Sequence, residues 1–357
     1  MKIGHIKLDA PFALAPMAGL TDSAFRRLVK RRGGCGLVVT EMVSSEGLVR
    51  GIDRTLEYAE YREEERPVSI QTFGGDPEKM ADAAQILESL GADIVDVNMG
   101  CPVQKIAKHN AGCSLMRQPQ HAARVVRAMT NAVQIPVTVK MRSGWSDEEI
   151  NAVQVAQMVE DAGAAAVAVH GRTAKQAYKG TSNWDLIGQV ASAVRIPVWG
   201  SGDCVEPDQL VDRMTQSGAA GVLVGRGALR NPWVFAQALD LANGKPARHI
   251  PLHVRGQFLL DYLDLLMTNP SDDDRGVHRL VQPVPRNPSS RERWVVNKLR
   301  ALASWYTKGL NRGTVLRQAI NSATSPEEIR DFISRFFLNA ECSPSSFSTS
   351  VGVLDEL

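Results

Sequence analysis

The stretch IVDVNMGCP, residues 94–102, combines a strand pattern with a loop that carries a thiol. Its first four residues have the apolar character of a buried strand, and the chain then turns through Gly100 into Cys101 and Pro102. A cysteine in a loop bounded by glycine and proline is exposed to whatever lies above the end of the strand. A free cysteine is more often a small buried hydrophobe, so this stretch alone does not decide between packing and chemistry.

Seven further apolar runs have the same form, and amphipathic stretches of helical length separate most of them. The eight runs lie at residues 12–15, 37–40, 68–71, 94–97, 137–139, 166–169, 198–200 and 221–224. Eight strand–helix units over about 230 residues match a (β/α)8 barrel in number and size. A doubly wound sheet is the alternative, but it seldom needs eight regular units. We therefore predict an α/β fold, a (β/α)8 TIM barrel.

Local patterns predict the ends of several elements and a second domain. Residues 3–9 alternate in polarity and predict a short hairpin, and helix starts are indicated by the cap patterns Asp76-Pro77, Asn231-Pro232, Ser146 with Glu149, and Ser325 with Glu328. After about residue 245 the period becomes helical, with helices expected at 253–267, 291–308, 314–320 and 325–337. We expect a barrel catalytic domain over 1–245, an all-helical domain over 246–340 with a loop insertion at 268–290, and a disordered tail over 341–357.

Composition limits the classes of function. The chain of 357 residues is 44% hydrophobic and 22% charged, which is ordinary for a globular protein. Its five cysteines are odd in number and form no CxxC pair, which argues against a disulfide framework, a zinc site and an iron–sulfur cluster. We find no leader-like segment and no membrane span, so we expect a cytoplasmic protein without a bound metal.

Basic residues are concentrated in one segment. Glu292 is the single acid between residues 275 and 317, and the rest of the chain is acidic on balance. The ten basic residues of the segment are Arg275, Arg279, Arg286, Arg291, Arg293, Lys298, Arg300, Lys308, Arg312 and Arg317. Such a localised positive charge is expected for a polyanionic partner, and a solvated helical face is the alternative.

Polar or glycine residues follow every predicted strand on one rim, where barrel active sites form. They are Pro16-Met17-Ala18, Glu41, Gln71, Asn98 leading to Cys101, Lys140 with Arg142, His170 with Arg172, Gly200-Ser201-Gly202-Asp203, and Gly225-Arg226-Gly227. Any single one has a structural explanation as a cap or a core residue, but eight together are hard to explain in that way.

The last two turns indicate a phosphate site. Glycine-rich turns after strands 7 and 8 let backbone N–H groups approach a phosphate, and Arg226 adds charge. Neither GxGxxG nor GxxxxGK[ST] occurs, which argues against a Rossmann dinucleotide site and a Walker NTPase. A phosphate-bearing cofactor across the barrel mouth, with Gln71 and Lys140 reaching its rings, suggests FMN.

The ordered set of motifs resembles the tRNA-dihydrouridine synthases, and most closely their bacterial DusB branch. The motifs are APMAGLTD at 15–22, QTFG at 71–74, NMGCP at 98–102, KMR at 140–142, HGRT at 170–173, GSGD at 200–203 and GRG at 225–227. The resemblance covers residues 5–245 strongly and 290–337 weakly. It implies an FMN enzyme that reduces particular uridines in tRNA with NADPH, or NADH, as the electron donor.

The resemblance also implies roles for residues, position by position. Cys101 is the expected proton donor. The expected cofactor residues are Pro16, Met17, Ala18, Gln71, Lys140, His170, Ser201, Gly202, Asp203, Gly225 and Arg226. The expected substrate residues are Asn98, Arg142 and Arg172 near the uracil, and Arg293, Lys298 and Arg300 on tRNA. We expect a monomer.

The chain departs from the family at two places. Ser201 replaces the usual asparagine of the glycine turn, and Arg300-Ala301-Leu302 stands where Arg-Lys-His usually precedes Trp305-Tyr306.

The chemistry of the residues agrees with the resemblance. A hydride added to C6 of uracil leaves C5 in need of a proton, and a protonated cysteine above the ring is a suitable acid. The alternatives are an FMN oxidoreductase of small molecules, of the dihydroorotate dehydrogenase type, and a tRNA-binding protein without catalysis. The basic segment argues against the first, and the complete set of strand-end residues argues against the second.

Overall fold

The computed structural model describes residues 1–107, 110–268, 276–281 and 287–338. The chain forms two compact units. The barrel unit comprises Met1–Arg248 with Asn269–Pro285, and the helical unit comprises His249–Thr268 with Arg286–Leu357.

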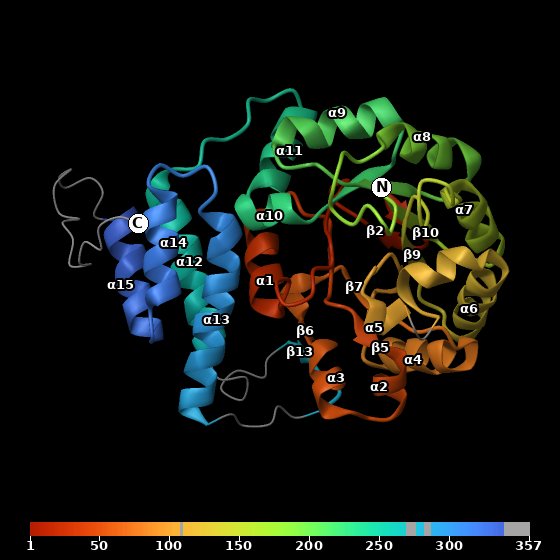
Figure 1. Ribbon diagram of the computed structural model, residues 1–357, viewed down its shortest axis with the longest axis horizontal. Helices are drawn as coiled ribbons and strands as arrows, with labels where there is room; N and C mark the ends of the chain where they lie inside the picture. The colour runs from red at the N-terminus through yellow and green to blue at the C-terminus, as the bar shows by residue number, and fades with distance from the viewer. Residues whose placement is uncertain (108–109, 269–275, 282–286, 339–357) are drawn as a thin grey trace, which may run out of the picture. The chain divides into compact units, whose positions relative to one another are not determined.

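The barrel unit is built on a closed parallel sheet, which confirms the predicted TIM barrel (Figure 1). The strand order is β4-β3-β12-β11-β10-β9-β8-β7, and a β4–β7 pairing closes the circle. The eight strands are β3 (Phe12–Leu14), β4 (Leu37–Val39), β7 (Val68–Phe73), β8 (Ile94–Met99), β9 (Val137–Arg142), β10 (Ala166–His170), β11 (Val198–Ser201) and β12 (Gly221–Val224). Short β5 (Val43–Ser44) adds to β7. All eight strands overlap the predicted apolar runs, because only segments buried on both faces read as continuous Val/Ile/Leu sequence.

Helices follow the strands and cover the sheet. The α-helices of the barrel unit are α1 (Ser23–Arg32), α2 (Ser45–Val49), α3 (Asp53–Tyr58), α4 (Pro77–Ser89), α5 (Gln104–Ala107), α6 (Pro119–Ala132), α7 (Ala152–Asp161), α8 (Trp184–Ala193), α9 (Pro207–Ser217), α10 (Arg226–Arg230) and α11 (Val234–Ala242). Two 3-10 segments are η1 (Glu63–Glu65) and η2 (Gly112–Arg117). Asp76 caps α4 as predicted, since its side chain accepts from the N–H groups of Glu78 and Lys79.

Two predicted helix starts are wrong. Ser146 and Glu149 do not form a capping box, because Ser146 accepts the Glu149 N–H through its backbone carbonyl in a turn, and α7 begins only at Ala152. Asn231 ends α10 as its C-cap, and α11 begins at Val234.

An apolar plug fills one end of the barrel. The predicted hairpin is present as β1 (Lys2–Ile3) paired antiparallel with β2 (Ile6–Lys7). Ile3 is buried together with Leu8 and inward-facing strand residues such as Trp199 and Leu223. The plug leaves the other end of the strands, where the polar residues lie, as the place for chemistry.

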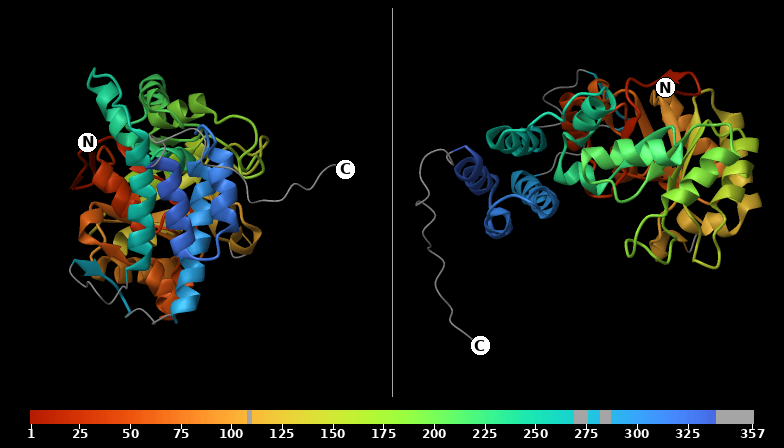
Figure 2. Two further views of the ribbon diagram at one scale, coloured as in Figure 1. Left: turned by 90° about the vertical axis from the view of Figure 1, so that its left-hand side faces the viewer. Right: turned by 90° about the horizontal axis from the view of Figure 1, so that it is seen from above.

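The helical unit contains the predicted helices. They are α12 (Leu252–Met267), α13 (Pro288–Tyr306), α14 (Gly313–Ser322) and α15 (Pro326–Phe337), and they lie side by side in Figure 2. Ser325 caps α15 by accepting from the Glu328 N–H, as predicted. Gly256 lets α12 approach α15 closely, because a Cβ at this position would lie 2.3 Å from the Cβ of Phe337. Among the described helices, none combines the length and the apolar character that a membrane crossing requires.

The predicted loop insertion at 268–290 is partly wrong. Its described residues 276–281 contain β13 (Val277–His278), which pairs antiparallel with β6 (Tyr61–Arg62) of the barrel unit. The His278 ring stacks on Tyr61 at 4.5 Å, and its Nε2 lies 2.7 Å from a carboxylate oxygen of Glu63. In addition, α13 already begins at Pro288. The predicted disordered tail at 341–357 lies outside the described residues.

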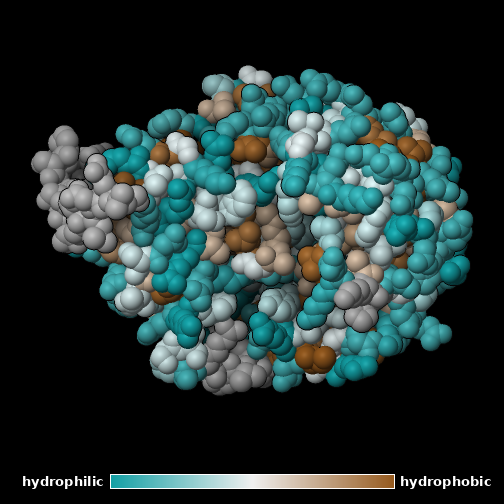
Figure 3. All heavy atoms as spheres, viewed as in Figure 1, coloured by the Kyte–Doolittle hydropathy of each residue, from teal (hydrophilic) through white to brown (hydrophobic). Residues whose placement is uncertain are grey.

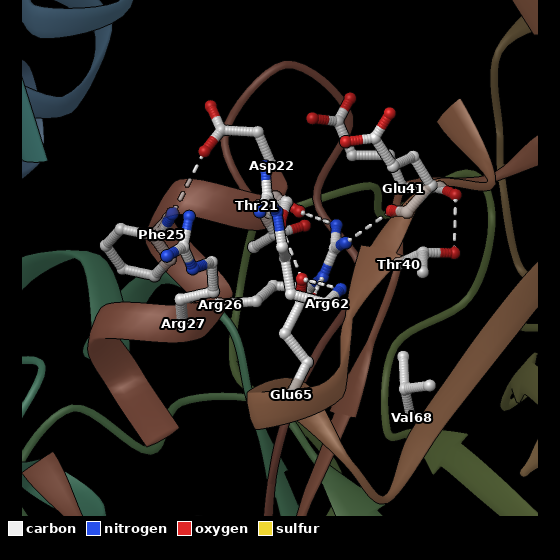
Figure 4. A network of polar contacts seen from close by, with 12 residues as sticks. Thr21, Asp22, Phe25, Arg26, Arg27, Thr40, Glu41, Arg62, Glu65 and Val68 are labelled. Carbon is white, nitrogen blue, oxygen red and sulfur yellow. Dashed lines mark hydrogen bonds and ion pairs between the residues drawn. The ribbon is translucent and has the colours of Figure 1, made fainter. Parts of the chain in front are cut away.

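A buried ion pair fixes the connection from β3 to α1 (Figure 4). Arg26 on α1 and Glu65 in η1 are 2% and 0% exposed, and Nε of Arg26 lies 2.5 Å from Oε2 of Glu65. The same guanidinium donates to the carbonyls of Thr21 (2.9 Å) and Glu60 (3.0 Å). Thr21 in turn holds Met17, accepting its N–H at 2.9 Å. The pair therefore anchors the loop that carries the expected cofactor residues 16–18.

Removing one charge of this pair is expected to destabilise the protein strongly. Glu65→Gln leaves the Arg26 guanidinium buried without a counter-charge, and we expect a loss of about 3–5 kcal/mol in unfolding free energy, measured by urea denaturation. Arg31→Ala is the matched control on the same helix, because Arg31 is 44% exposed and pairs with Glu64. This variant should lose less than about 1 kcal/mol. Equal losses in the two variants would contradict the prediction.

Candidate active site

The pairing register of the barrel strands places the expected site residues at the same end of the sheet. Asn98 on β8 lies opposite Lys140 on β9, and His170 on β10 lies opposite both Arg142 on β9 and Ser201 on β11. Strand residues two apart point to the same side. The structure therefore brings the residues predicted from β7 to β11 together at the same rim of the barrel.

The Cys101 loop is held by hydrogen bonds from both sides. The Asn98 Oδ1 atom accepts the N–H groups of Gly100 (3.1 Å) and Cys101 (2.9 Å). The Cys101 carbonyl accepts from the N–H of Cys113 at 3.1 Å, and Gly112 is required there because a Cβ would lie 2.8 Å from that carbonyl. The loop is thus rigid, and it leaves Cys101 partly exposed.

A chain of buried polar side chains supports this loop from below. Asp96 on β8 accepts from Oγ1 of Thr138 (2.6 Å) and from Nε2 of Gln71 (2.7 Å). The Gln71 Oε1 atom then accepts from Nδ2 of Asn98 at 2.7 Å. All four side chains are less than 9% exposed. Burial raises the pKa of Asp96, while its two hydrogen bonds and Lys140 act in the opposite direction. No role for Asp96 could be predicted from the sequence, since a carboxyl group inside an apolar strand has no local signature.

Positive charge gathers around His170. Burial and the nearby charges of Lys140, Arg142, Arg172 and Arg226 lower the pKa of His170 to about 2, so the imidazole is neutral at any working pH. Burial and the Arg142 charge also lower the pKa of Lys140 to about 8. Such a cluster fits an anionic ligand, because a phosphate or a reduced ring would relieve the mutual repulsion of the cations.

The two barrel arginines that are expected to lie near the uracil donate hydrogen bonds to neighbouring loops. Arg142 is 4% exposed and donates to the carbonyls of Gly100 (2.8 Å), Thr173 (2.9 Å) and Ala177 (3.0 Å). Arg172 is 2% exposed, and its Nη2 atom donates to both carboxylate oxygens of Asp203, at 2.7 and 2.8 Å. In this geometry, both arginines position loops of the site.

The glycine turns after β11 and β12 fit a phosphate group. Both strands are paired, so the turn of Ser201 to Asp203 lies beside Gly225 and Arg226. Gly202 has φ +119°, and a Cβ there would lie 2.3 Å from Oγ of Ser182, so only glycine fits. Arg226 is 38% exposed and lies 4.0 Å from Asp203. This set offers backbone N–H groups and a cation to an anion.

The loop of residues 16–21 borders the same rim. The Thr21 hydroxyl and N–H bond to Met17, and Glu41 accepts the Gly19 N–H at 2.6 Å. These bonds leave Ala18 exposed and Met17 half-buried at the mouth.

Tyr178 is a rim residue that could not be predicted from the sequence. Its ring is 60% exposed and lies 5.8 Å from the Arg142 guanidinium and 4.8 Å from that of Arg226. Nothing in the local sequence marks it, because its partners come from the end of β9 and the start of α10.

The predicted tRNA residues of the helical unit differ in their surroundings. Arg293 is exposed on α13. Lys298 is half-buried, with Nζ 5.7 Å from the ring of Trp294. Arg300 donates to the Ala323 carbonyl at 2.8 Å and so connects α13 to the chain before α15. The surface in Figure 3 is largely hydrophilic.

The fold and the strand-end residues define an enzyme of the TIM-barrel class. Residues 13–341 match the family model described as "Dihydrouridine synthase (Dus)". The chain therefore belongs to the dihydrouridine synthase family, whose members are flavin-dependent oxidoreductases that act on uridine in tRNA. The resemblance stated from the sequence is confirmed.

Named relatives extend over most of the chain. The probable tRNA-dihydrouridine synthase of Rickettsia bellii is 36% identical over 346 residues, covering 94% of this chain and 98% of that protein. The tRNA-dihydrouridine synthase B of Shewanella oneidensis is 40% identical over 267 residues, covering 74% of this chain and 83% of that protein. The probable tRNA-dihydrouridine synthase of Rhodobacter capsulatus is 42% identical over 252 residues, covering 70% and 78%.

Cys101 is expected to react with alkylating agents far faster than the other described cysteines. Burial raises the pKa of Cys35 and Cys113 to about 11 and that of Cys204 to about 12, so their thiolate fractions are very small at pH 8. Limited iodoacetamide treatment followed by peptide mass spectrometry should label Cys101 at least about tenfold faster than these three. Equal labelling of Cys101 and Cys113 would show that the loop does not expose the thiol.

Proposed function

We propose that the barrel unit holds FMN across the strand ends and reduces the C5=C6 bond of uridines in tRNA, with NADPH as the electron donor. Family membership supports the reaction, and the donor set supports the cofactor. A phosphate fits the Ser201–Asp203 and Gly225–Arg226 turns, and Lys140 supplies positive charge to the ring system. Pro16, Met17, Ala18, Gln71 and His170 complete the proposed cofactor residues.

Gln71 retains hydrogen-bonding capacity for the cofactor. Its Nε2 atom donates to Asp96 and its Oε1 atom accepts from Asn98, which leaves a second N–H on Nε2 and a second lone pair on Oε1. The neutral imidazole of His170 accepts from Nη1 of Arg172 through Nε2 at 3.4 Å, which leaves the Nδ1–H as a donor without adding charge.

Cys101 is the proposed proton donor. When bound and reduced, FMN would supply the hydride that C6 of the uracil receives. Cys101 then delivers its Sγ proton to C5, so that the two additions together saturate the bond. The Cys101 N–H donates to Asn98, and Arg142 donates to the Gly100 carbonyl. These two hydrogen bonds hold the loop, and with it the thiol, in a fixed position above the strand ends. This fixed and partly exposed thiol is the observation that carries the proposal.

The helical unit is the part of the chain that we propose binds tRNA. Arg293, Lys298 and Arg300 belong to α13, and a target base must leave its stack before it reaches a barrel site. Phosphate contacts by exposed cations such as Arg293 would offset part of that cost. We further propose that the protein acts as a monomer in the cytoplasm.

The reaction is tested by nucleoside mass spectrometry of unmodified tRNA after incubation with the protein and NADPH. Uridine should gain two hydrogens, and Cys101→Ala should slow this gain by at least about a hundredfold while the flavin spectrum is kept. Full activity of the variant would remove the proton-donor role. A yellow protein that oxidises NADPH without changing tRNA would favour a small pyrimidine substrate instead.

The role of Lys140 predicts a pH dependence of FMN binding. Because its pKa is lowered to about 8, the side chain is mostly charged at pH 7 and loses its charge as the pH rises through 8. The affinity of the apoprotein for FMN, measured by quenching of flavin fluorescence, should fall by up to about tenfold between pH 7 and 9.5. Lys140→Met should bind FMN more weakly at pH 7 and lack this fall. An equal pH dependence in Lys140→Met would assign the titration to another group.

A further inference from the structure

Residues 182–184, directly before and at the start of α8, hold the turn that follows β11. Ser182 donates through Oγ to the Ser201 carbonyl at 3.1 Å, and Trp184 donates through Nε1 to the Gly202 carbonyl at 3.0 Å. Both donor residues are buried. Two successive carbonyls of the proposed phosphate turn are therefore bound from the side of α8. We call residues 182–184 the template segment.

The template segment is itself fixed to the barrel. The Asn183 N–H donates to the Gly171 carbonyl at 2.7 Å, and the Asn183 side chain caps α8 by accepting the Leu186 N–H at 2.9 Å. The Trp184 ring packs against β11, because a Cβ at Gly200 would lie 2.2 Å from Cζ3 of the indole. The strand ends thus set the positions of both donors.

Binding these two carbonyls sets the direction of the N–H groups that follow them. In a planar trans peptide, the C=O of one residue and the N–H of the next point in opposite directions. The Ser201 carbonyl also accepts the N–H of the residue that follows β10, so the Gly202 N–H points away from β10 and toward β12, which Gly225 and Arg226 follow. The Gly202 carbonyl faces the indole, so the Asp203 N–H points away from α8. Among the described residues, none accepts the Asp203 N–H.

Asp203 is held in the same arrangement by its side chain. Its φ is +55°, in the left-handed region that residues other than glycine rarely adopt. Its carboxylate accepts the Ser182 N–H at 2.7 Å and two hydrogen bonds from Nη2 of Arg172. Backbone strain of this kind persists only where several contacts determine the conformation, and it is concentrated at ligand sites.

We propose that the template segment is a positioning element of the phosphate site, in which Ser182 and Trp184 orient two peptide planes so that the N–H groups of Gly202 and Asp203 are presented to the phosphate. The inference rests on the proposed function, because it takes the anion at this turn to be the phosphate of FMN. Ser182 and Trp184 act through the turn and are positioning residues. Their effect is therefore expected on the phosphate and not on the flavin rings.

A comparison of FMN with riboflavin tests this role, because riboflavin has the same ring system and no phosphate. Both affinities are measured on the flavin-free, full-length protein by quenching of flavin fluorescence. Trp184→Phe removes the indole donor and keeps an aromatic ring against Gly200, and Ser182→Ala removes only the hydroxyl donor. Each change should lower the preference for FMN over riboflavin by about threefold to tenfold, the effect of one hydrogen bond. The affinity for riboflavin should stay close to that of the unchanged protein.

The barrel offers a matched control for each variant. Trp199→Phe and Ser69→Ala delete the same kinds of donor, but the Trp199 Nε1 and the Ser69 Oγ have no hydrogen-bond partner among the described residues. Both controls should keep the preference of the unchanged protein for FMN, even where they lower the melting temperature. The phosphorus NMR resonance of bound FMN should shift in Trp184→Phe and stay in place in Trp199→Phe.

Three other outcomes would overturn the inference, and they differ in what they leave standing. An unchanged preference for FMN in both variants would mean that the turn binds phosphate without help from the template segment. Equal losses of both affinities would mean that Ser182 and Trp184 only stabilise the fold. If the unchanged protein bound riboflavin as tightly as FMN, the phosphate site of the proposed function would fail together with the inference.

Discussion

The backbone N–H groups of Gly100 and Cys101 can only donate hydrogen bonds. This sets the direction of the side-chain hydrogen bonds that run from Asn98 through Gln71 to Asp96. Asn98 must turn its oxygen toward these donors, so its NH2 group faces Gln71. Gln71 must then present its oxygen to Asn98, which turns its own NH2 group toward Asp96. Asp96 therefore accepts from Gln71 through Oδ2, while its Oδ1 accepts from the Thr138 hydroxyl. The position of the thiol loop is thus tied to a buried carboxyl group two strand residues before Asn98.

The layer above this carboxyl group is cationic. Burial first, and then the charges of four cations, lower the pKa of His170 and keep it neutral; the cations are Lys140, Arg142, Arg172 and Arg226. The arginines are not equivalent: Arg142 and Arg172 are buried and donate to backbone carbonyls or to Asp203, whereas Arg226 is 38% exposed. Arg142 and Arg172 therefore contribute mainly by fixing loops and by raising the electrostatic potential at the site. Lys140, with its pKa lowered to about 8, is the cation whose charge is most sensitive to what surrounds it.

The sequence was sufficient for the elements whose signal is local. Eight apolar runs gave eight strands, and Asp76 and Ser325 were found as caps because a cap bonds to residues two or three positions away. The pattern at Ser146 and Glu149 failed, since a bridge between Gly144 and Ile150 and a bond from the Trp145 N–H to the Glu149 carbonyl form a turn there instead.

Features that depend on distant segments could not be predicted in this way. The pairing of β13 with β6 joins His278 to Glu63 across 215 positions, and no local pattern in a loop rich in Asp and Pro indicates such a strand. Asp96 could not be recognised for the same reason. Its neighbours in sequence are apolar, and its partners Gln71 and Thr138 come from the two adjacent strands. Barrel closure is what supplies those partners, so the residues that align Cys101 become recognisable only once the strand register is known. The rim residues of a barrel can be predicted from the end of each strand alone. The groups that orient them can be identified only when the pairing between strands is known.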